Sequence, residues 1–470
     1  MVNRNRSGRQ MGSSGFVLLA VASLTLALPT DTRGQTAPAG EVTFSRDVAP
    51  LLQRSCETCH RPDSIAPMSL RTYDEVRPYA RAIRLQTSQR TMPPWYIEKN
   101  VGIQGFMSDP SLSDQEIATI ARWVDAGAPQ GDPADMPPPK TFKDVREWTL
   151  GEPDLVVASS PRLVEPAAPD WWGQLGSIET KLTEDRYIKS SEIREVNDIP
   201  PGTDFSGTVG GLNVFHHASV TIIPPDGKFD PSSILPAHEV GRNADEFDPE
   251  AGRLIRAGAA ISFNNNHLHA NGRKTTARLE VGLRFHPKGY KPTIDFRGIF
   301  FGTTEIDLRG NEAGQTVDSY YTLPANAKIM NFEPHMHAPA VRMCVEAIYG
   351  QTITALNCAG YNHNWVRNYQ YLSNSAPLLP KGTILHIRGW FDTTPANRNV
   401  VDPRNWTGGG NRSVDNMFAD LAYMVVLTDE EFDQAVAERE AKVRAGQAEA
   451  AGCLTCFSGK PMDPRLAQVP

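Results

Sequence analysis

The sequence predicts a multidomain protein in which a small all-α domain precedes two all-β domains, each an antiparallel β-sandwich. The chain has 470 residues, and one domain usually takes roughly 100–200. Glycine and proline number 37 each, an excess that indicates many turns and much β structure. Residues 277–285 alternate between apolar and polar side chains, as a half-buried antiparallel strand does. Helical signals are scarce between residues 145 and 427.

Composition excludes some classes of function. Hydrophobic residues make up 40% of the chain and charged residues 21%, which is typical of a globular protein rather than a disordered one. The formal net charge is −7, which argues against a nucleic-acid partner bound by bulk charge.

The first residues have the pattern of a targeting segment. Three arginines precede an apolar run from Phe16 to Leu28, and small and polar residues follow. This predicts a cleaved signal peptide over residues 1–35, with an uncleaved anchor as the alternative. The run is short for a bilayer span. We therefore expect a periplasmic or secreted protein with no stable membrane insertion.

The six cysteines form three pairs in the sequence. An even number in an exported protein favours disulfides. Cys344 and Cys358 are expected to form a disulfide between neighbouring strands. For Cys453 and Cys456 a local disulfide is favoured over a metal site.

The first cysteine pair differs, because Cys56, Cys59 and His60 form a C-x-x-C-H pattern, the attachment pattern of covalent haem. Two thiols at this spacing reach both vinyl groups on one porphyrin edge, and the histidine is then the proximal iron ligand. We predict a covalent haem c at these residues. A disulfide beside an uninvolved histidine is the alternative.

The residues around this motif predict a small helical domain. Ser113 and Glu116 form a capping box ahead of an apolar stripe at helical spacing, and Gly127 ends that helix. Residues 41–131 thereby resemble a small c-type cytochrome domain.

The resemblance requires a sixth iron ligand, and two methionines are candidates. Met92 is favoured because it has a longer path from His60 and is stiffened by two prolines, in a Thr-Met-Pro-Pro-Trp segment that resembles the distal loop of such domains. Met68, with a short path from His60, is the alternative, and otherwise packs against the haem edge.

The remaining boundaries follow from composition. The proline-rich stretch after the helical domain predicts a stiff linker. A capping pattern at Thr428 begins a segment expected to form an exposed helix. The expected divisions are a linker at 132–144, β-sandwiches at 145–300 and 301–427, and a C-terminal helix and tail at 428–470.

Three histidine pairs lie in the region expected to be β structure. In a strand, an H-x-H pair places both imidazoles on one face, close enough for one metal. Imidazole suits copper and zinc, and an added thioether favours copper, particularly Cu(I). A single H-x-H pair is often structural, so the order of the pairs is the stronger signal: His216 with His217, His267 with His269, and His335 with His337.

This order, followed by a late Asp-x-Met segment at residues 415–417, resembles the copper type II, ascorbate-dependent monooxygenases. That family includes peptidylglycine α-hydroxylating monooxygenase and dopamine β-monooxygenase. The resemblance covers about residues 145–427. It implies a first copper held by His216, His217 and His267, with His269 as an alternative to His267.

The resemblance implies a second, catalytic copper held by His335, His337 and Met417. The sequence departs from the family at Asn416, where glutamate is usual, and in the Ala-Pro-Ala that follows the H-x-H pair. Other methionines remain alternatives to Met417, although two of them are expected in the core, and four further histidines are expected to be structural or at the surface. The alternative methionines are Met336, Met343 and Met424, and the remaining histidines are His238, His286, His363 and His386.

Together the resemblances imply an exported monooxygenase that contains covalent haem c and two copper ions. It would insert one oxygen atom of O₂ into a C–H bond of a small organic substrate. Electrons would come from an ascorbate-like reductant or a redox protein and enter through the haem. One alternative is a non-catalytic electron-transfer protein with a copper-binding β scaffold. A zinc hydrolase is a weaker alternative, because no acidic general base lies at a recognisable spacing and methionine is a poor zinc ligand.

Overall fold

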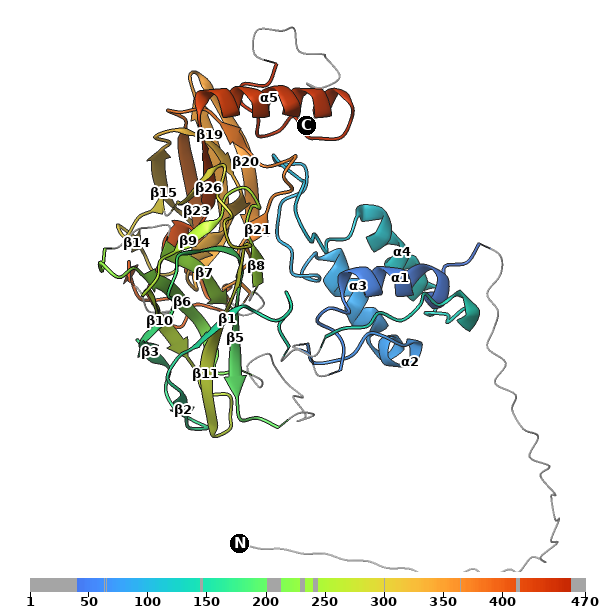
Figure 1. Cartoon of the computed structure of the whole chain (residues 1–470). Helices are drawn as coiled ribbons and strands as arrows, with labels where there is room; N and C mark the ends of the chain where they lie inside the picture. The colour runs from blue at the N-terminus through green and yellow to red at the C-terminus, as the bar shows by residue number, and fades with distance from the viewer. Residues whose placement is uncertain are drawn as a thin grey trace, which may run out of the picture.

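The computed structural model describes residues 40–62, 64, 66–143, 147–200, 213–228, 233–239, 244–299, 301–363, 365–410 and 415–457. These residues form mostly antiparallel β-sheets with few helices, as the sequence predicts. Every pairing between named strands in this part of the chain is antiparallel. Figure 1 shows the first helices gathered on one side of the strands and α5 at one end of them. The predicted signal peptide lies outside the described residues.

The helical part of the chain has a core of its own. Phe44 and Trp123 are almost completely buried, and their ring centroids lie 6.0 Å apart. This core supports the C-x-x-C-H segment, which directly follows α1. Its elements are η1 (Phe44–Val48), α1 (Ala49–Ser55), α2 (Tyr73–Val76), η2 (Arg77–Tyr79), α3 (Ala80–Ser88), α4 (Asp114–Asp125) and η3 (Pro133–Asp135).

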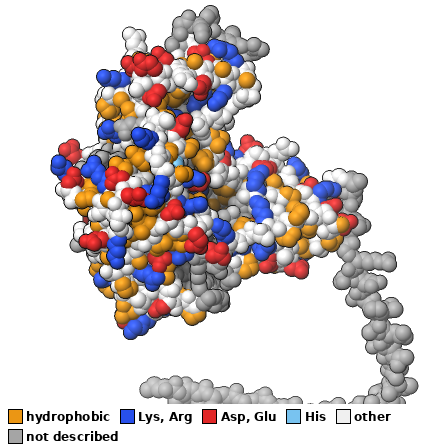
Figure 2. Space-filling view, viewed as in Figure 1, with side chains coloured by type: hydrophobic (Ala, Val, Ile, Leu, Met, Phe, Trp, Pro, Cys, Tyr) orange, Lys and Arg blue, Asp and Glu red, His pale blue; other side chains and the backbone are white. Residues whose placement is uncertain are grey.

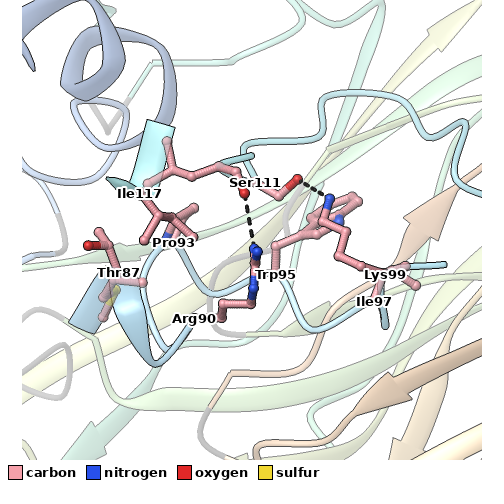
Figure 3. Close-up of a pocket in the computed structure, with 10 residues that line it drawn as sticks. Thr87, Arg90, Pro93, Trp95, Ile97, Lys99, Ser111 and Ile117 are labelled. Carbon is pink, nitrogen blue, oxygen red and sulfur yellow. Dashed lines mark hydrogen bonds between the residues drawn. The ribbon is translucent and has the colours of Figure 1, made fainter. Parts of the chain in front are cut away.

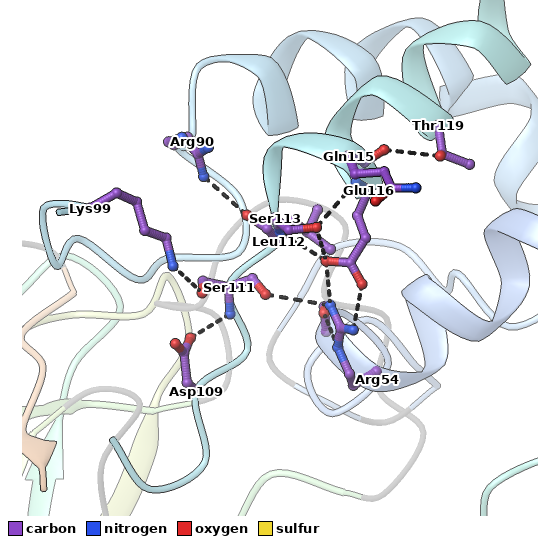
Figure 4. Close-up of polar contacts among 11 residues, drawn as sticks. Arg54, Arg90, Lys99, Asp109, Ser111, Leu112, Ser113, Gln115, Glu116 and Thr119 are labelled. Atoms are coloured by element: carbon purple, nitrogen blue, oxygen red, sulfur yellow. Dashed lines mark hydrogen bonds and ion pairs between the residues drawn. The ribbon is translucent and has the colours of Figure 1, made fainter. Parts of the chain in front are cut away.

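A charged contact joins α1 to the start of α4 (Figure 4). The predicted capping box is present, since the side chain of Ser113 accepts from the backbone N–H of Glu116 and that carboxylate accepts from the backbone of Ser113. Arg54 at the end of α1 donates to the same carboxylate at 2.6 Å. Glu116 therefore both caps its own helix and pairs with the helix that precedes the haem motif.

The N-terminal β region, Leu155–Phe285, consists of two sheets with a shared apolar core between them, as a sandwich requires. The predicted alternation of β11 is confirmed, because its apolar side chains from Ala277 to Phe285 are buried. The six-stranded sheet contains β1 (Leu155–Ala158), β2 (Arg162–Val164), β5 (Arg186–Asn197), β8 (Ala244–Glu246), β9 (Arg253–Ile255) and β11 (Thr275–Phe285). The five-stranded sheet contains β3 (Trp171–Gly173), β4 (Gly176–Glu179), β6 (Phe215–Ile223), β7 (Ile234–Glu239) and β10 (Ala260–Leu268).

The C-terminal β region, Asp295–Leu427, is built from several smaller sheets around a second core. Its longest strands form the four-stranded sheet β15-β23-β19-β20. Its strands are β12 (Asp295–Gly298), β13 (Phe301–Gly302), β14 (Asp307–Leu308), β15 (Ala313–Thr322), β16 (Asn326–Ile329), β17 (Asn331–Phe332), β18 (Pro334–Met336), β19 (Ala340–Tyr349), β20 (Thr352–Gly360), β21 (Tyr369–Gln370), β22 (Leu378–Leu379), β23 (Ile384–Asp392), β24 (Thr407–Gly408), β25 (Phe418–Asp420) and β26 (Tyr423–Leu427).

Both predicted disulfides are present. Cys344 and Cys358 face each other in the register of β19 and β20, with Cα atoms 4.0 Å apart. Cys453 and Cys456 form the local disulfide that the sequence favours over a metal site.

Residues 95–107 leave the helical part and join the core of the C-terminal β region. The side chains of Trp95, Ile103 and Phe106 are buried in that core. The backbone N–H of Ile103 donates to the carbonyl of Leu356 on β20 at 2.9 Å. The helical part is therefore attached to the sheets by a buried segment as well as by the chain after residue 131.

Helix α5 (Asp429–Arg444) begins where the capping pattern at Thr428 predicts. Most of its residues are exposed, as expected, while Phe432, Arg439 and Val443 on one face are buried. Arg439 donates to the carbonyl of Ala376 at 2.9 Å, which anchors the helix to the C-terminal β region. In the described residues, no helix has both the length and the apolar character needed to cross a membrane.

Charged side chains of both signs are distributed over the molecule. On the face drawn in Figure 2, acidic and basic groups are interspersed over the helical part and the sheets. This face therefore carries no extended field of a single sign.

Candidate metal centre

One group of imidazoles comes from two paired strands of the N-terminal β region. His216 and His217 lie at the start of β6, and His267 near the end of β10 faces His217 in the strand register. The ring centroid of His216 lies 5.0 Å from that of His267 and 5.4 Å from that of His269. The rings of His217 and His267 are 5.3 Å apart. We call these four residues the first histidine group.

Irregular backbone at the end of β10 helps to bring this group together. The register between β6 and β10 shifts on both sides of His267, and Asn265 has a positive φ of 45°. Such bulges re-aim side chains that would otherwise alternate across a strand. Here His267 and His269 lie with their rings 5.9 Å apart, and both rings contact His216.

Neighbouring side chains hold the first group in place. Nε2 of His267 lies 3.1 Å from Oδ2 of Asp170, and the ring of Trp172 stacks on His267 with centroids 4.4 Å apart. The carboxylate of Glu195 accepts from the backbone N–H of Phe215, next to His216, at 2.8 Å. Burial raises the pKa of Glu195 to about 7. Asp170 and Glu195 were not identified from the sequence, because each reaches the group from another strand or loop.

The surroundings of the first group favour neutral imidazoles. Burial, together with the neighbouring imidazoles, lowers the pKa of His216 to about 2 and that of His217 well below its usual value. Burial also lowers the pKa values of His267 and His269. Metal binding requires the neutral imidazole. In addition, Nε2 of His217 is buried and has no hydrogen-bond partner among the described residues.

The second histidine group consists of His335 and His337, at β18 of the C-terminal β region. Their ring centroids are 5.9 Å apart. Nδ1 of His337 lies 2.9 Å from the carbonyl of Asp415. A histidine that binds a metal usually donates its other ring N–H to such a carbonyl. This contact comes from the Asp-x-Met segment that the sequence singles out.

The methionine candidates separate by position. In the register of β18 and β25, His335 faces Ala419, which places Met417 just before the paired residues. Met417 lines a cavity together with His335. Met336, Met343 and Met424 are instead buried in the apolar core, at 0%, 0% and 3% exposure.

That cavity lies between the two β regions and has a volume of about 420 Å³. It contains His217 from the first group, and His335 and Met417 from the second. Much of its remaining wall is apolar, with Ile234, Leu235, Ile299, Leu421 and Ala422. Ligand pockets of this size and character take small organic molecules.

His363, which the sequence analysis expects to be structural or at the surface, lies beside both histidine groups. Its ring lies 5.5 Å from His216 and 5.8 Å from His337, so that it contacts both groups. These two contacts come from distant segments of the chain, which sequence spacing cannot reveal. Of the other three histidines, His238 on β7 pairs with Ala218 of β6 and lies near enough to His216 to help lower its pKa. His286 stacks on Tyr290, and His386 lies beside Asp318 and Glu346.

The residues of the C-x-x-C-H motif follow α1. Cys56 and Cys59 are the two cysteines that form no disulfide. Burial raises the pKa of Cys56 to about 12 and also raises that of Cys59. Nδ1 of His60 lies 3.2 Å from the carbonyl of Met68. That contact orients the imidazole and leaves Nε2 for another partner.

The two candidates for the sixth iron ligand have different surroundings. The backbone of Met68 lies on the Nδ1 side of His60, away from Nε2. Met92 is 42% exposed and borders a pocket of about 20 Å³ with Pro93, Trp95 and Ile117 (Figure 3). That pocket has room for little more than water, so a haem would have to approach Met92 from its exposed side.

The histidine groups fit a metal by ring position but not yet by donor direction. Two imidazoles that bind one metal at about 2 Å have ring centroids roughly 5 Å apart, close to the spacings of 5.0–5.9 Å among His216, His217, His267 and His269. In the described residues, however, no set of three or more His, Cys, Asp or Glu groups is already arranged to hold a metal ion. Ring spacing decides the fit more than ring orientation does. An imidazole rotates about χ2 at a small cost in free energy, whereas moving the backbone costs more.

Comparisons with known proteins add little. No family model matches the chain, and no curated protein matches it. The major capsid protein P2 from bacteriophage PM2 is 11% identical, with 58% of this chain and 100% of that chain covered and a TM-score of 0.29. The infectious bursal disease virus VP2 subviral particle is 8% identical, with coverage of 62% and 76% and a TM-score of 0.20. Similarities this low support no inference about the present chain.

Proposed function

We propose that the protein is an exported monooxygenase with covalent haem c and two copper ions. It inserts one oxygen atom of O₂ into a C–H bond of a small organic substrate. The other atom leaves as water, so each turnover consumes two electrons and two protons from a donor. Export is supported by the two disulfides, which persist in oxidising compartments.

The observation that carries this proposal is the cavity shared by both histidine groups. His217 reaches it from one β region, and His335 and Met417 reach it from the other. The apolar part of its wall suits a small organic substrate. Copper bound by these residues would supply one-electron transfer and O₂ activation.

The chain itself prepares the site for soft and borderline metals. Burial keeps the imidazoles of His216 and His217 neutral, and neutral imidazole is the form that binds metal. The carbonyl of Asp415 orients His337 through Nδ1. The thioether of Met417 adds a ligand that favours Cu(I) over zinc. These features support copper rather than a zinc hydrolase.

The helical part supports the haem proposal in a similar way. Cys56 and Cys59 are not paired in a disulfide, and the carbonyl of Met68 orients His60 through Nδ1. Because the backbone of Met68 lies on the Nδ1 side of His60, Met92 is the better candidate for the iron ligand on the opposite haem face. Burial raises the pKa of Cys59, and the guanidinium of Arg367 opposes that rise. Because Arg367 belongs to the C-terminal β region, the motif faces that region.

The proposal is tested by electron flow from haem to O₂. The haem of the copper-loaded protein is reduced, excess reductant is removed, and the protein is mixed with O₂ and a panel of small aliphatic and aromatic compounds. We expect haem reoxidation to accelerate with copper present, and ¹⁸O from ¹⁸O₂ to appear in a product.

Copper-stripped protein is the control, with the same haem content verified by absorbance. If haem reoxidation is equally fast without copper and no ¹⁸O is incorporated, the monooxygenase proposal fails. Copper binding without O₂ consumption would instead favour the non-catalytic electron-transfer protein.

A further inference from the structure

His363 occupies the position between the two histidine groups. It follows β20, and its ring centroid lies 5.5 Å from His216 and 5.8 Å from His337. The rings are tilted to one another by 58° and 63°, an arrangement that does not resemble stacking. These spacings match those within the first histidine group, where rings lie 5.0–5.9 Å apart.

The segment that carries His363 is fixed to the second group by a short contact. Tyr361, two residues earlier, donates from its hydroxyl to the carbonyl of Met336 at 2.5 Å, and that hydroxyl accepts from the N–H of Met336 at 3.2 Å. Met336 is the residue between His335 and His337. The H-x-H pair and His363 are therefore held together through one tyrosine.

The same segment is fixed to the chain that comes from the helical part. The backbone N–H of Gly360 donates to the carbonyl of Tyr96 at 2.9 Å, and the side chain of Asn362 donates to the hydroxyl of Tyr96 at 3.3 Å. Further along, Arg367 lies over the ring of Trp95 at 5.2 Å. His363 is thus placed by contacts on both sides.

We propose that His363 is an additional copper-binding residue that joins the two histidine groups into one continuous centre. This inference rests on the proposed function, because it takes copper as the metal of both groups. It goes beyond that function by adding an imidazole that belongs to neither of the expected ligand sets.

The test is copper binding by the full-length haem protein, with haem absorbance as an internal count of protein. Wild type, His363→Ala and His363→Gln are titrated with Cu(I) against a chromophoric chelator. Pulsed electron paramagnetic resonance of the Cu(II) forms counts the coordinated imidazoles. We expect both variants to lose about tenfold or more in affinity for at least one copper and to show one coordinated imidazole fewer.

His386→Ala is the matched control, because His386 is buried in the same β region and contacts Asp318 and Glu346 rather than the histidine groups. It should retain wild-type copper affinity. If a His363 variant keeps both the wild-type affinity and the wild-type number of imidazoles, the inference is overturned while the proposed function stands. If the wild type itself binds no copper, the proposed function fails as well. The glutamine variant retains a polar side chain should the alanine variant not fold.

Discussion

Asp170 and His267 are separated by 97 residues in the sequence, yet Oδ2 of Asp170 lies 3.1 Å from Nε2 of His267. The contact fixes which ring nitrogen of His267 remains for other partners, namely Nδ1. The carboxylate of Asp170 is half exposed, at 47%, so Asp170 reaches the buried ring of His267 from the surface. Asp170 therefore acts on the first histidine group without belonging to it.

Asp170→Asn is expected to weaken copper binding at the first histidine group by about 10-fold to 100-fold, the usual effect of losing a partner that orients a ligand. The measurement is a Cu(I) competition titration of the purified protein. Asp226→Asn is the matched control, because Asp226 is similarly exposed, at 43%, in the same β region. Equal affinities of the two variants would show that Asp170 does not orient a ligand.

Met417→Leu is expected to lower Cu(I) affinity at the second histidine group by roughly tenfold or more, and Cu(II) affinity by less, since a thioether favours the reduced ion. Leucine preserves volume, so the fold should be retained. Met107→Leu, at an exposed methionine, controls for loss of any thioether. Unchanged Cu(I) affinity in Met417→Leu would remove this residue from the ligand set.

Met92→Ala is expected to abolish the absorption band of a thioether bound to haem iron, whereas Met68→Ala should keep it. The reason is that the backbone of Met68 lies beside Nδ1 of His60 rather than beside Nε2. Absorption spectra of the oxidised variants make the comparison. In both variants the haem should stay with the chain in acidified organic solvent, because Cys56 and Cys59 remain. The reverse spectral result would reassign the ligand to Met68.

Glu116→Gln is expected to destabilise the helical part by about 1 kcal/mol at pH 7, a modest value because Arg54 is half exposed. The hydrogen bond from Arg54 is the main cause that lowers the pKa of Glu116 to about 2. A carboxyl with a lowered pKa contributes stability above its unfolded pKa, near 4.5, and loses it as pH falls through about 2. Glutamine keeps the capping box, so the comparison isolates the charge.

Urea unfolding followed by haem absorbance at pH 7, 4 and 2.5 makes this measurement. The difference between Glu116→Gln and wild type should shrink steadily toward the acid end. Glu305→Gln, an exposed glutamate of the C-terminal β region, serves as the control. A difference that stays constant with pH would mean that charge is not its source.

Removing the disulfide with Cys344→Ala and Cys358→Ala together is expected to cost roughly 3 kcal/mol, because the bond closes a loop of about 15 residues. The two residues are 14 positions apart on adjacent strands. Denaturant unfolding of the C-terminal β region gives the value. Labelling of either thiol in the native, unreduced wild type would contradict the disulfide itself.

Local patterns in the sequence predicted much of the fold. The capping boxes at Ser113 and Thr428, the alternation of β11 and the pairing of Cys344 with Cys358 are all present. Each depends on residues near one another in the chain or on adjacent strands. The buried face of α5 was not predicted, because its apolar side chains are too few to give a clear stripe.

Only the part of the candidate site that consists of histidines close together in the sequence could be predicted. The H-x-H pairs are local, and their rings do lie close together. Asp170 and Glu195 were not predicted, and His363 was assigned elsewhere, because their contacts depend on how separate strands pack. The bulge around His267 likewise depends on pairing with β6, which the spacing of the histidines does not show.

The burial of residues 95–107 limits how the protein can be divided. Trp95 and Phe106 lie between α3 and α4 of the helical part in the sequence but are core residues of the C-terminal β region. A gene cut at the proline-rich linker would leave those sheets without part of their interior and expose tryptophan and phenylalanine on the excised piece. The helical part and the β regions are therefore not interchangeable modules. Any exchange of the helical part for another, by evolution or by an engineer, has to keep residues 95–107 intact.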